Sequence, residues 1–263
     1  MDAPRAELVG AVHGVTLVVP CFNEARRFVP EAWLELIARG VFLVLVDDGS
    51  TDDTAGILEA LRTRSPVAVS VLRLTTNLGK GEAIRLGALR AMSDGAVYVG
   101  FADADGATPP CELLRLAEHL RSSGTDVVLG ARVVMLGTEI RRRAVRHFAG
   151  RVFATAASLV LDEAVYDTQC GAKFFRVIPA LRVALARPFS SRWAFDVELL
   201  GRLRVGARGV PGLGRASFVE VPLLRWTDVP GSHLRFGSML RAAGDLAIVA
   251  LNLRTDPNWS QRR

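Results

Sequence analysis

The stretch Phe42-Leu-Val-Leu-Val-Asp-Asp-Gly-Ser50 joins a short apolar run to an acidic, glycine-bearing turn. The apolar run predicts a buried strand, and Ser50-Thr-Asp-Asp53 can cap a helix that continues to about Thr63. An earlier apolar run, Val15-Thr-Leu-Val-Val-Pro20, predicts another buried strand, and residues 31–39 between the two have helical spacing. Strand, helix and strand in this order predict a βαβ unit, which requires a parallel sheet.

The alternation of strands and helices continues to about residue 131. Further strands are expected at 67–72, 96–101 and 127–129, and further helices at 81–92 and 111–121. We therefore predict an α/β fold with a Rossmann-like, mostly parallel central sheet and helices on both of its faces. Ligands of such sheets bind at the carboxyl ends of the strands.

The pattern changes at about residue 132, where longer helical stretches begin. Helices are expected at 148–161, 195–203 and 234–253, and an edge strand at 218–223. We interpret the 263 residues as one domain with two halves, 15–131 and 132–263.

Composition narrows the class of protein. The chain is 50% hydrophobic and 23% charged, enough for one sizeable core, which excludes a disordered chain or a disulfide scaffold. Its three cysteines, Cys21, Cys111 and Cys170, form no C-x-x-C pair, so reduced thiols in a cytoplasmic chain are expected. No apolar run reaches the roughly 18 residues of a membrane span, and no signal peptide is recognisable. A soluble or peripheral protein is expected.

The charge balance is basic, with 33 Lys and Arg against 27 Asp and Glu. Lys80 and Lys173 are the only lysines, so arginine carries nearly all of the positive charge. This excess suits anionic membranes or phosphorylated molecules, although it can also reflect a GC-rich coding sequence. The arginines are not interleaved with stacking aromatic residues, so no nucleic-acid partner is expected.

Polar residues follow four of the predicted strands. They are Asn23 and Glu24, Asp47 and Asp48, Asn77, and finally Asp103 and Asp105. Because the carboxyl ends of parallel strands meet at one edge of a sheet, these side chains are expected to converge. Asp103 and Asp105 could both reach a divalent cation, and their hard oxygen atoms favour Mg²⁺ or Mn²⁺. The alternative is that they only form a turn.

Two of these clusters also have both a structural and a functional interpretation. Asp47 and Asp48 end a buried strand, where a carboxylate could accept hydrogen bonds from a nucleobase or a ribose, or could simply cap a helix. Asn77-Leu-Gly-Lys-Gly81 opens a helix, where free backbone N–H groups and Lys80 could face a phosphate. A tight turn explains the two glycines equally well.

In this order the motifs resemble those of inverting glycosyltransferases of family 2, which have the GT-A fold. The matching segments are Val18–Glu24 (VVPCFNE), Asp47–Asp52 (DDGSTD), Asn77–Gly81 (NLGKG) and Asp103–Gly106 (DADG). Among the polyprenyl-phosphate sugar synthases of that family, three further segments resemble the dolichyl-phosphate β-glucosyltransferases more than the mannose synthases. They are Asp167–Phe175 (DTQCGAKFF), Arg192–Glu198 (RWAFDVE) and Trp226–Ser232 (WTDVPGS).

The resemblance implies roles for individual residues. The donor-binding residues would be Pro20, Asn23, Glu24, Asp47, Asp48, Gly79, Lys80, Asp103 and Ala104. Of these, Pro20, Asn23, Glu24 and Asp47 would hold the uracil and the ribose. Asp103 and Asp105 would bind the metal that bridges the diphosphate. Arg132, Lys173 and one of the arginines at 141–143 would face an acceptor phosphate and the departing charge. Asp196 and Glu198 would orient the sugar or the metal, so the catalytic set is Asp105, Arg132, Lys173 and Asp196.

The implied activity is a metal-dependent, inverting transfer of a hexose, with glucose expected, from a UDP-sugar to a polyprenyl or dolichyl phosphate. Residues 15–131 would then be the nucleotide-sugar half and 132–263 the acceptor half. Contact with the inner face of a membrane would be peripheral, through the helix around 141–160 or the tail. Two alternatives remain open: a soluble small-molecule acceptor, or a non-catalytic protein that binds nucleotide sugars.

Overall fold

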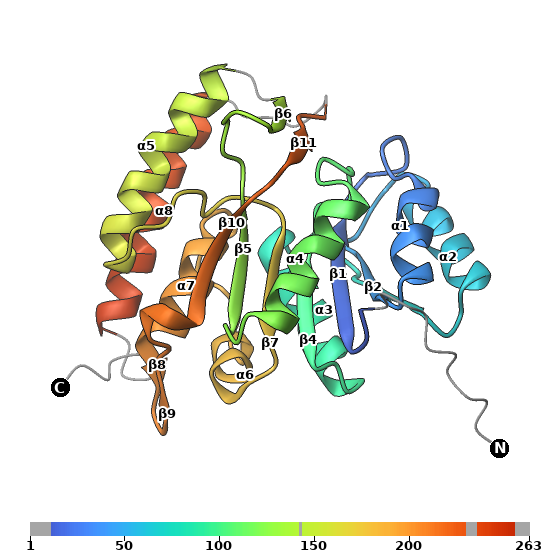
Figure 1. The fold of residues 1–263 in the computed structure, drawn as a ribbon, viewed down its shortest axis with the longest axis horizontal. Coiled ribbons are helices and arrows are strands. Elements are labelled where there is room, and N and C mark those ends of the chain that lie inside the picture. The colour runs from blue at the N-terminus through green and yellow to red at the C-terminus, as the bar shows by residue number, and fades with distance from the viewer. Residues whose placement is uncertain (1–11, 142–143, 230–235, 256–263) are drawn as a thin grey trace.

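The computed structural model describes residues 12–141, 144–229 and 236–255. At its centre is a seven-stranded sheet with the order β10-β5-β7-β4-β1-β2-β3 (Figure 1). These strands are β1 (Val15–Cys21), β2 (Phe42–Asp47), β3 (Val69–Arg73), β4 (Tyr98–Phe101), β5 (Val127–Ala131), β7 (Lys173–Arg176) and β10 (Phe218–Pro222). Only β7 runs antiparallel to its neighbours in this sheet. The prediction of a mostly parallel sheet is confirmed.

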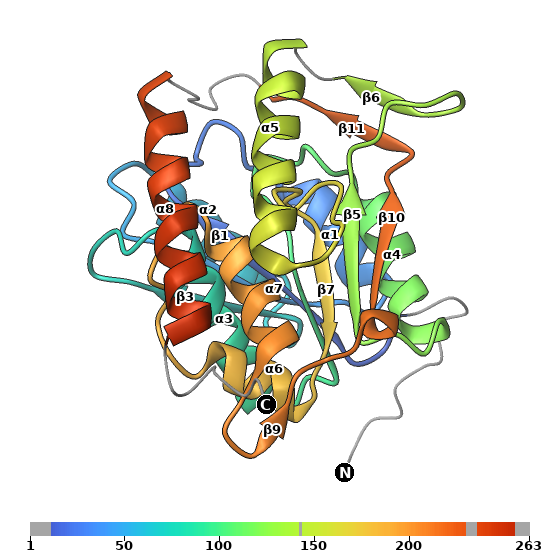
Figure 2. The ribbon, with the colours of Figure 1, turned by 90° about the vertical axis from the view of Figure 1, so that its left-hand side faces the viewer.

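Helices cover both faces of the sheet, as expected. One face carries α1 (Pro30–Ala38), α2 (Thr54–Arg64) and α4 (Pro110–Ser122), and the other α3 (Lys80–Ser93), α6 (Pro179–Leu185) and α7 (Phe195–Val205). Outside α7, α5 (Ala144–Leu161) and α8 (Phe236–Thr255) stand side by side (Figure 2). The sheet therefore separates two hydrophobic cores, and the second is deeper because two layers of helices cover it.

Close packing fixes helix α3 against the sheet. A Cβ atom on Gly87 would collide with the side chains of Val18 and Val46, so only glycine lets the helix backbone approach this closely. At the start of the same helix, a Cβ atom on Gly81 would collide with Phe195 of α7. The first turn of α3 is thereby held at the carboxyl edge of the sheet.

The antiparallel strand β7 was not predicted. The sequence analysis treated residues 167–175 only as a motif, because four residues with two adjacent phenylalanines show no strand periodicity. Its direction matters for the site. Lys173, the first residue of β7, pairs with Phe101 at the carboxyl end of β4, so the loop before Lys173 lies at the same edge as Asp103.

Several smaller elements were also missed. They are α6 and two short strand pairs, β6 (Glu139–Arg141) with β11 (Arg225–Thr227) and β8 (Gly206–Ala207) with β9 (Val210–Pro211). The expected edge strand at 218–223 is confirmed as β10. Within the described ranges, no helix combines the length and apolar character that would let it cross a bilayer.

Candidate active site

The loops after β1 and β2 are joined to each other by hydrogen bonds at the carboxyl edge. Asn23 accepts a hydrogen bond at Oδ1 from the backbone N–H of Thr51 (2.8 Å), and its own N–H donates to Ser50 Oγ (3.1 Å). The N–H of Glu24 donates to Thr54 Oγ1 (2.8 Å). Asn23 has a φ of 54°, which asparagine tolerates better than most residues. Its side chain thus organises the loop, and a contact with uracil or ribose stays a prediction.

Asp47 and Asp48 are buried, and both carboxylates accept hydrogen bonds from backbone N–H groups. Asp47 accepts at Oδ1 from Ser50 (2.9 Å), while the two oxygens of Asp48 accept from Leu78 (2.7 Å) and Gly79 (2.9 Å). Burial raises the pKa of Asp48, and the two N–H donors oppose that shift. In this structure the two acids hold turns in place, and Asp48 in particular fixes the start of α3.

A residue that the sequence analysis did not assign, Arg192, lies across that turn. Its guanidinium donates to the carbonyl oxygen of Asn77 (3.3 Å) and to the side-chain oxygen of the same residue. Gly79 has a φ of 100°, and a Cβ atom there would collide with the Arg192 guanidinium. Arg192 therefore joins two of the sequence motifs, a contact that no pattern within a single sequence marks.

Asp103 and Asp105 follow strand β4 near Lys80, and Glu24 from the loop after β1 is close enough to interact with both aspartates. The Lys80 Nζ atom lies 2.5 Å from Oδ1 of Asp103. Burial alone would raise the pKa of Asp103, but the Lys80 ammonium holds it below its ordinary value. For Asp105, burial and the charge of Asp103 raise the pKa, and the charges of Arg27 and Lys80 oppose that shift. Burial likewise raises the pKa of Glu24, with Arg27 opposing and both aspartates adding to the shift.

These carboxylates fit a divalent cation that is shared with a substrate. Asp105 accepts one backbone hydrogen bond, from Ala107 (3.1 Å), and Oε2 of Glu24 is buried with no hydrogen-bond partner. Burial and the charge of Asp103 both raise the pKa of Asp105, and a cation bound beside the two carboxylates would offset these costs. Among the described residues, no three His, Cys, Asp or Glu side chains surround one point, so phosphates and water would have to complete the coordination.

Lys173 and Asp196 form a buried ion pair beneath this cluster. The fully buried Lys173 ammonium donates to Asp196 Oδ1 (2.5 Å) and to the carbonyl oxygen of Cys170 (2.5 Å). Burial raises the pKa of Asp196, while Lys173 and Lys80 oppose that shift. The structure therefore places Lys173 under the candidate site, where it neutralises Asp196, and not on a surface that an acceptor would touch.

The loop before β7 links the acidic cluster to Arg132. Asp167 accepts from Arg132 through both carboxylate oxygens, from Nε (2.7 Å) and from Nη2 (2.8 Å). Glu220 of β10 accepts from the N–H groups of Tyr166 (2.7 Å) and Asp167 (2.9 Å), which fixes the loop. Gly171 lies so close to the Asp103 carboxylate that a Cβ atom would overlap it. Neither Asp167 nor Gly171 was assigned a role from the sequence.

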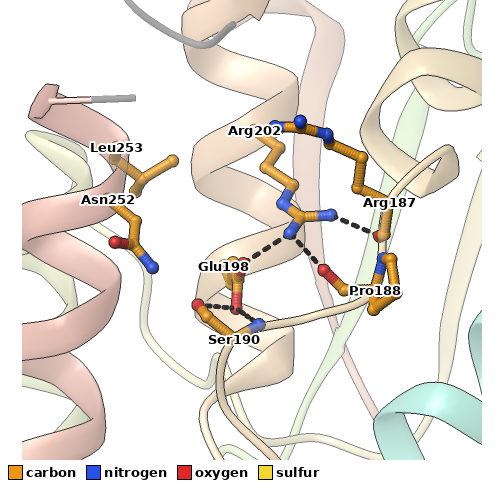
Figure 3. Close-up of a pocket in the computed structure, with 7 residues that line it drawn as sticks. All are labelled: Arg187, Pro188, Ser190, Glu198, Arg202, Asn252 and Leu253. Carbon is orange, nitrogen blue, oxygen red and sulfur yellow. Dashed lines mark hydrogen bonds and ion pairs between the residues drawn. The ribbon is translucent and has the colours of Figure 1, made fainter. Parts of the chain in front are cut away.

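Glu198 does not join this site, contrary to what the resemblance implied. Its Oε2 atom accepts from Ser190 N (2.9 Å) and Ser190 Oγ (2.8 Å), and its Oε1 atom accepts from Arg202 (2.6 Å). The reason is helical geometry, because residues two apart project about 200° apart around a helix. Figure 3 shows Glu198 in a separate pocket of about 250 Å³, which also includes Asn252 of α8.

The remaining predicted residues are placed as follows. Pro20 lies in β1 and Ala104 is buried between the two aspartates. Arg141 is exposed in β6, whereas Arg142 and Arg143 lie outside the described residues, as do Pro230 to Ser232 of the last motif. The structure therefore brings together Asp48, Gly79, Lys80, Asp103, Asp105, Lys173 and Asp196 through the contacts given above.

Comparisons with known proteins identify the family of the chain. The model of glycosyl transferase family 2 matches residues 16–180. A dolichyl-phosphate β-glucosyltransferase of Trichomonas vaginalis is 31% identical over 254 residues, covering 91% of this chain and 71% of the relative. The human dolichyl-phosphate β-glucosyltransferase is 30% identical over 280 residues, covering 97% of this chain and 78% of the relative.

Solved structures show the same fold. Glucosyl-3-phosphoglycerate synthase from Mycobacterium tuberculosis, in complex with Mn²⁺, UDP and phosphoglyceric acid, has a TM-score of 0.63 at 20% identity. That alignment covers 90% of this chain and 77% of the other. A mannosyltransferase from Pyrobaculum calidifontis, in complex with GDP-mannose and Mn²⁺, has a TM-score of 0.55 at 17% identity, covering 90% and 62%. The chain belongs to glycosyl transferase family 2, has the GT-A fold, and is a glycosyltransferase that resembles the dolichyl-phosphate β-glucosyltransferases.

Proposed function

We propose that the chain transfers glucose, with inversion, from UDP-glucose to a polyprenyl or dolichyl phosphate with the help of Mg²⁺ or Mn²⁺. The identity to dolichyl-phosphate β-glucosyltransferases, which extends over nine tenths of the chain, supports the choice of substrates. The observation that supports this chemistry is the ion pair between Lys80 and Asp103, with Asp105 beside it at the carboxyl edge of the sheet.

Asp103 and Asp105 would hold the cation, which when bound neutralises charge on the diphosphate of the leaving nucleotide. Lys80 stands at the first turn of α3, where its ammonium and the positive end of the helix both favour a phosphate group. Asp48 prepares this position because it fixes the two N–H groups that precede the helix. The residues of the chain would thus contribute to catalysis by holding positive charge in place before the reaction begins.

The acceptor needs no strong general base in this reaction. A phosphate monoester is already ionised near neutral pH, so in-line placement of one of its oxygens against the sugar carbon is sufficient. We assign contact with the acceptor phosphate to Arg132. Its guanidinium is oriented by both oxygens of Asp167 and lies 5.2 Å from the centre of the Trp226 ring. Inversion at the sugar carbon of an α-linked donor would yield a β-linked product.

The proposed location is the cytoplasmic side of a membrane, with peripheral contact. The free cysteines support a reducing compartment, since Cys21 and Cys170 are buried thiols and Cys111 is an exposed one. Burial raises the pKa of Cys170 to about 11, which keeps that thiol protonated and unreactive.

The test is a partition assay with radiolabelled UDP-glucose, Mn²⁺ and polyprenyl phosphate. Label that enters butanol and is lost with EDTA is the expected result. Label that stays in water on a new product would show a soluble acceptor instead. UDP binding without transfer or donor hydrolysis would show a non-catalytic nucleotide-sugar-binding protein, and either outcome would overturn the proposal.

A further inference from the structure

Three consecutive apolar side chains are exposed on the loop between β5 and β6. The exposed fractions are 61% for Val134, 46% for Met135 and 102% for Leu136. A fully exposed leucine directly after two other exposed apolar residues leaves a continuous hydrophobic tip in water, which is unfavourable unless something covers it. Figure 2 shows this loop projecting beyond the body of the molecule.

The tip is a turn that is held by several hydrogen bonds. Thr138 accepts a hydrogen bond at Oγ1 from the N–H of Met135 (3.1 Å) and donates its hydroxyl to the carbonyl oxygen of the same residue (2.8 Å). The N–H of Thr138 donates to that carbonyl as well (3.1 Å), and Gly137 supplies the positive φ of 86° that the turn requires. These bonds pair both backbone groups of Met135 and the N–H of Thr138, while the three apolar side chains stay exposed.

The position of the turn relates it to the candidate site. Only Val133 separates Val134 from Arg132, the residue that we assign to the acceptor phosphate. The turn therefore follows directly from the carboxyl end of β5, at the edge of the sheet where Asp103 and Asp105 lie. A surface that touches the tip would also face the acceptor side of the site.

The charges at the base of the turn favour an anionic surface. Arg141 is exposed in β6, and Arg225 in the neighbouring strand β11 is 65% exposed and lies 3.8 Å from the exposed Glu139. A second copy of the chain is a poorer occupant, because a stable protein interface buries roughly 1,200–2,000 Å² and this tip is three side chains on a projection. Binding to a bilayer, in contrast, requires only a few inserted apolar side chains with basic residues beside them.

We propose that the turn Val134–Thr138 inserts its three apolar side chains into an anionic lipid bilayer and so seats the active site on the membrane. The proposal deepens the proposed function, because it identifies the surface through which a lipid-linked acceptor would be reached. It differs from the expectation that the helix around 141–160 or the tail makes this contact.

The experiment compares three forms of the full chain for sedimentation with vesicles of phosphatidylcholine and phosphatidylglycerol. In the first variant Val134, Met135 and Leu136 are all replaced by serine. In the second, Val152 and Leu159, which are 67% and 76% exposed on α5, are replaced by serine as a matched loss of apolar surface. We expect the turn variant to bind about tenfold more weakly and the α5 variant to bind like the wild type.

Turnover separates this proposal from the proposed function. With a short, water-soluble isoprenyl phosphate as acceptor, the turn variant should keep wild-type activity, whereas with polyprenyl phosphate in vesicles it should lose activity together with binding. A wild type that binds vesicles through the turn but transfers no sugar to either acceptor would refute the proposed function alone.

Any of several results would overturn the membrane proposal. The first is that the turn variant or the wild type contradicts it directly, through unchanged vesicle binding by the variant or no binding by the wild type. The second is loss of binding by the α5 variant, which would assign the contact to that helix. The third is a wild-type dimer that the turn variant dissociates, which would show that the turn contacts a second copy of the chain.

Discussion

The two halves of the candidate site are held together by different kinds of interaction. In the half before residue 132, the loops are held by hydrogen bonds from backbone N–H groups to short polar side chains. Asp48, for example, accepts from Leu78 and Gly79. In the later half, backbone hydrogen bonds such as those to Glu220 are joined by buried ion pairs, in which Lys173 donates to Asp196 and Arg132 donates to Asp167. Backbone donors remain in place when a side chain is replaced, but a buried charge depends on its partner.

The comparison leads to a general expectation. Changes in the first half should affect activity more than stability, because the backbone keeps its shape around a solvent-facing cluster. Changes in the second half should affect stability first, because they leave a charge buried and unpaired. The predictions below test this contrast, in order of decreasing effect.

The largest effect is expected for Lys173→Met. The substitution leaves the Asp196 carboxylate buried without its cation, which should lower the free energy of unfolding by about 3–5 kcal/mol. Urea denaturation measures the change. The double variant Lys173→Met with Asp196→Leu is the control, because removing both charges should recover much of the loss. A single variant within about 1 kcal/mol of wild type would contradict the contrast between the halves.

Asp105→Ala should have little effect on folding and a large effect on transfer. We expect a loss of about 10²–10³-fold in the rate of glucose transfer, with the urea midpoint close to that of wild type. Mn²⁺ binding, followed by electron paramagnetic resonance, should weaken in parallel. Asp94→Asn is the matched control, since Asp94 is an exposed carboxylate paired with Arg90 (2.7 Å). Substantial turnover by Asp105→Ala would remove the proposed metal role.

Gly171→Ala tests the contact between the halves. The new Cβ atom would overlap the Asp103 carboxylate, so we expect a destabilisation of about 1–3 kcal/mol and weaker Mn²⁺ binding together. Gly214→Ala is the control, because a Cβ atom there meets nothing within 4 Å. Unchanged Mn²⁺ binding in Gly171→Ala would show that the loop before β7 does not set the position of Asp103.

Acidic pH should weaken metal binding before it unfolds the protein. Burial and the charge of Asp103 raise the pKa of Asp105, so this carboxylate becomes protonated at a higher pH than an ordinary aspartate. Because a metal requires the ionised form, Mn²⁺ affinity should fall as the pH falls through that raised pKa. Affinity titrations across acidic pH measure the midpoint, and a midpoint at or below the ordinary aspartate value would contradict the burial argument.

The smallest effect is expected for Arg73→Gln. Arg73 lies 3.5 Å from Asp47, but its side chain is 70% exposed, and the Asp47 carboxylate is also held by the N–H of Ser50. The change in the free energy of unfolding should be within about 0.5 kcal/mol, with transfer unaffected. A loss of activity would mean that this ion pair, and not the backbone, holds Asp47.

The sequence predicted the first half well because its signals are local. Apolar runs end at Asp47 and Phe101, and the polar residues that follow them must lie at one edge once the strands are parallel. The second half depends on which distant segments pair, so neither β7 nor the Lys173–Asp196 pair could be predicted from periodicity. The error on Glu198 was avoidable, since its two-residue spacing from Asp196 on one helix already points it elsewhere.

The insertion of β7 also constrains the order in which the chain can fold. Strands β4 and β5 follow one another in sequence but are not neighbours in the sheet, because β7 lies between them. A chain ending near residue 131 would leave both strands with an unpaired edge, a state prone to pairing with other chains. We expect the nascent protein to complete its sheet only after Lys173–Arg176 has been synthesised, so the two halves cannot be expressed as separate working modules.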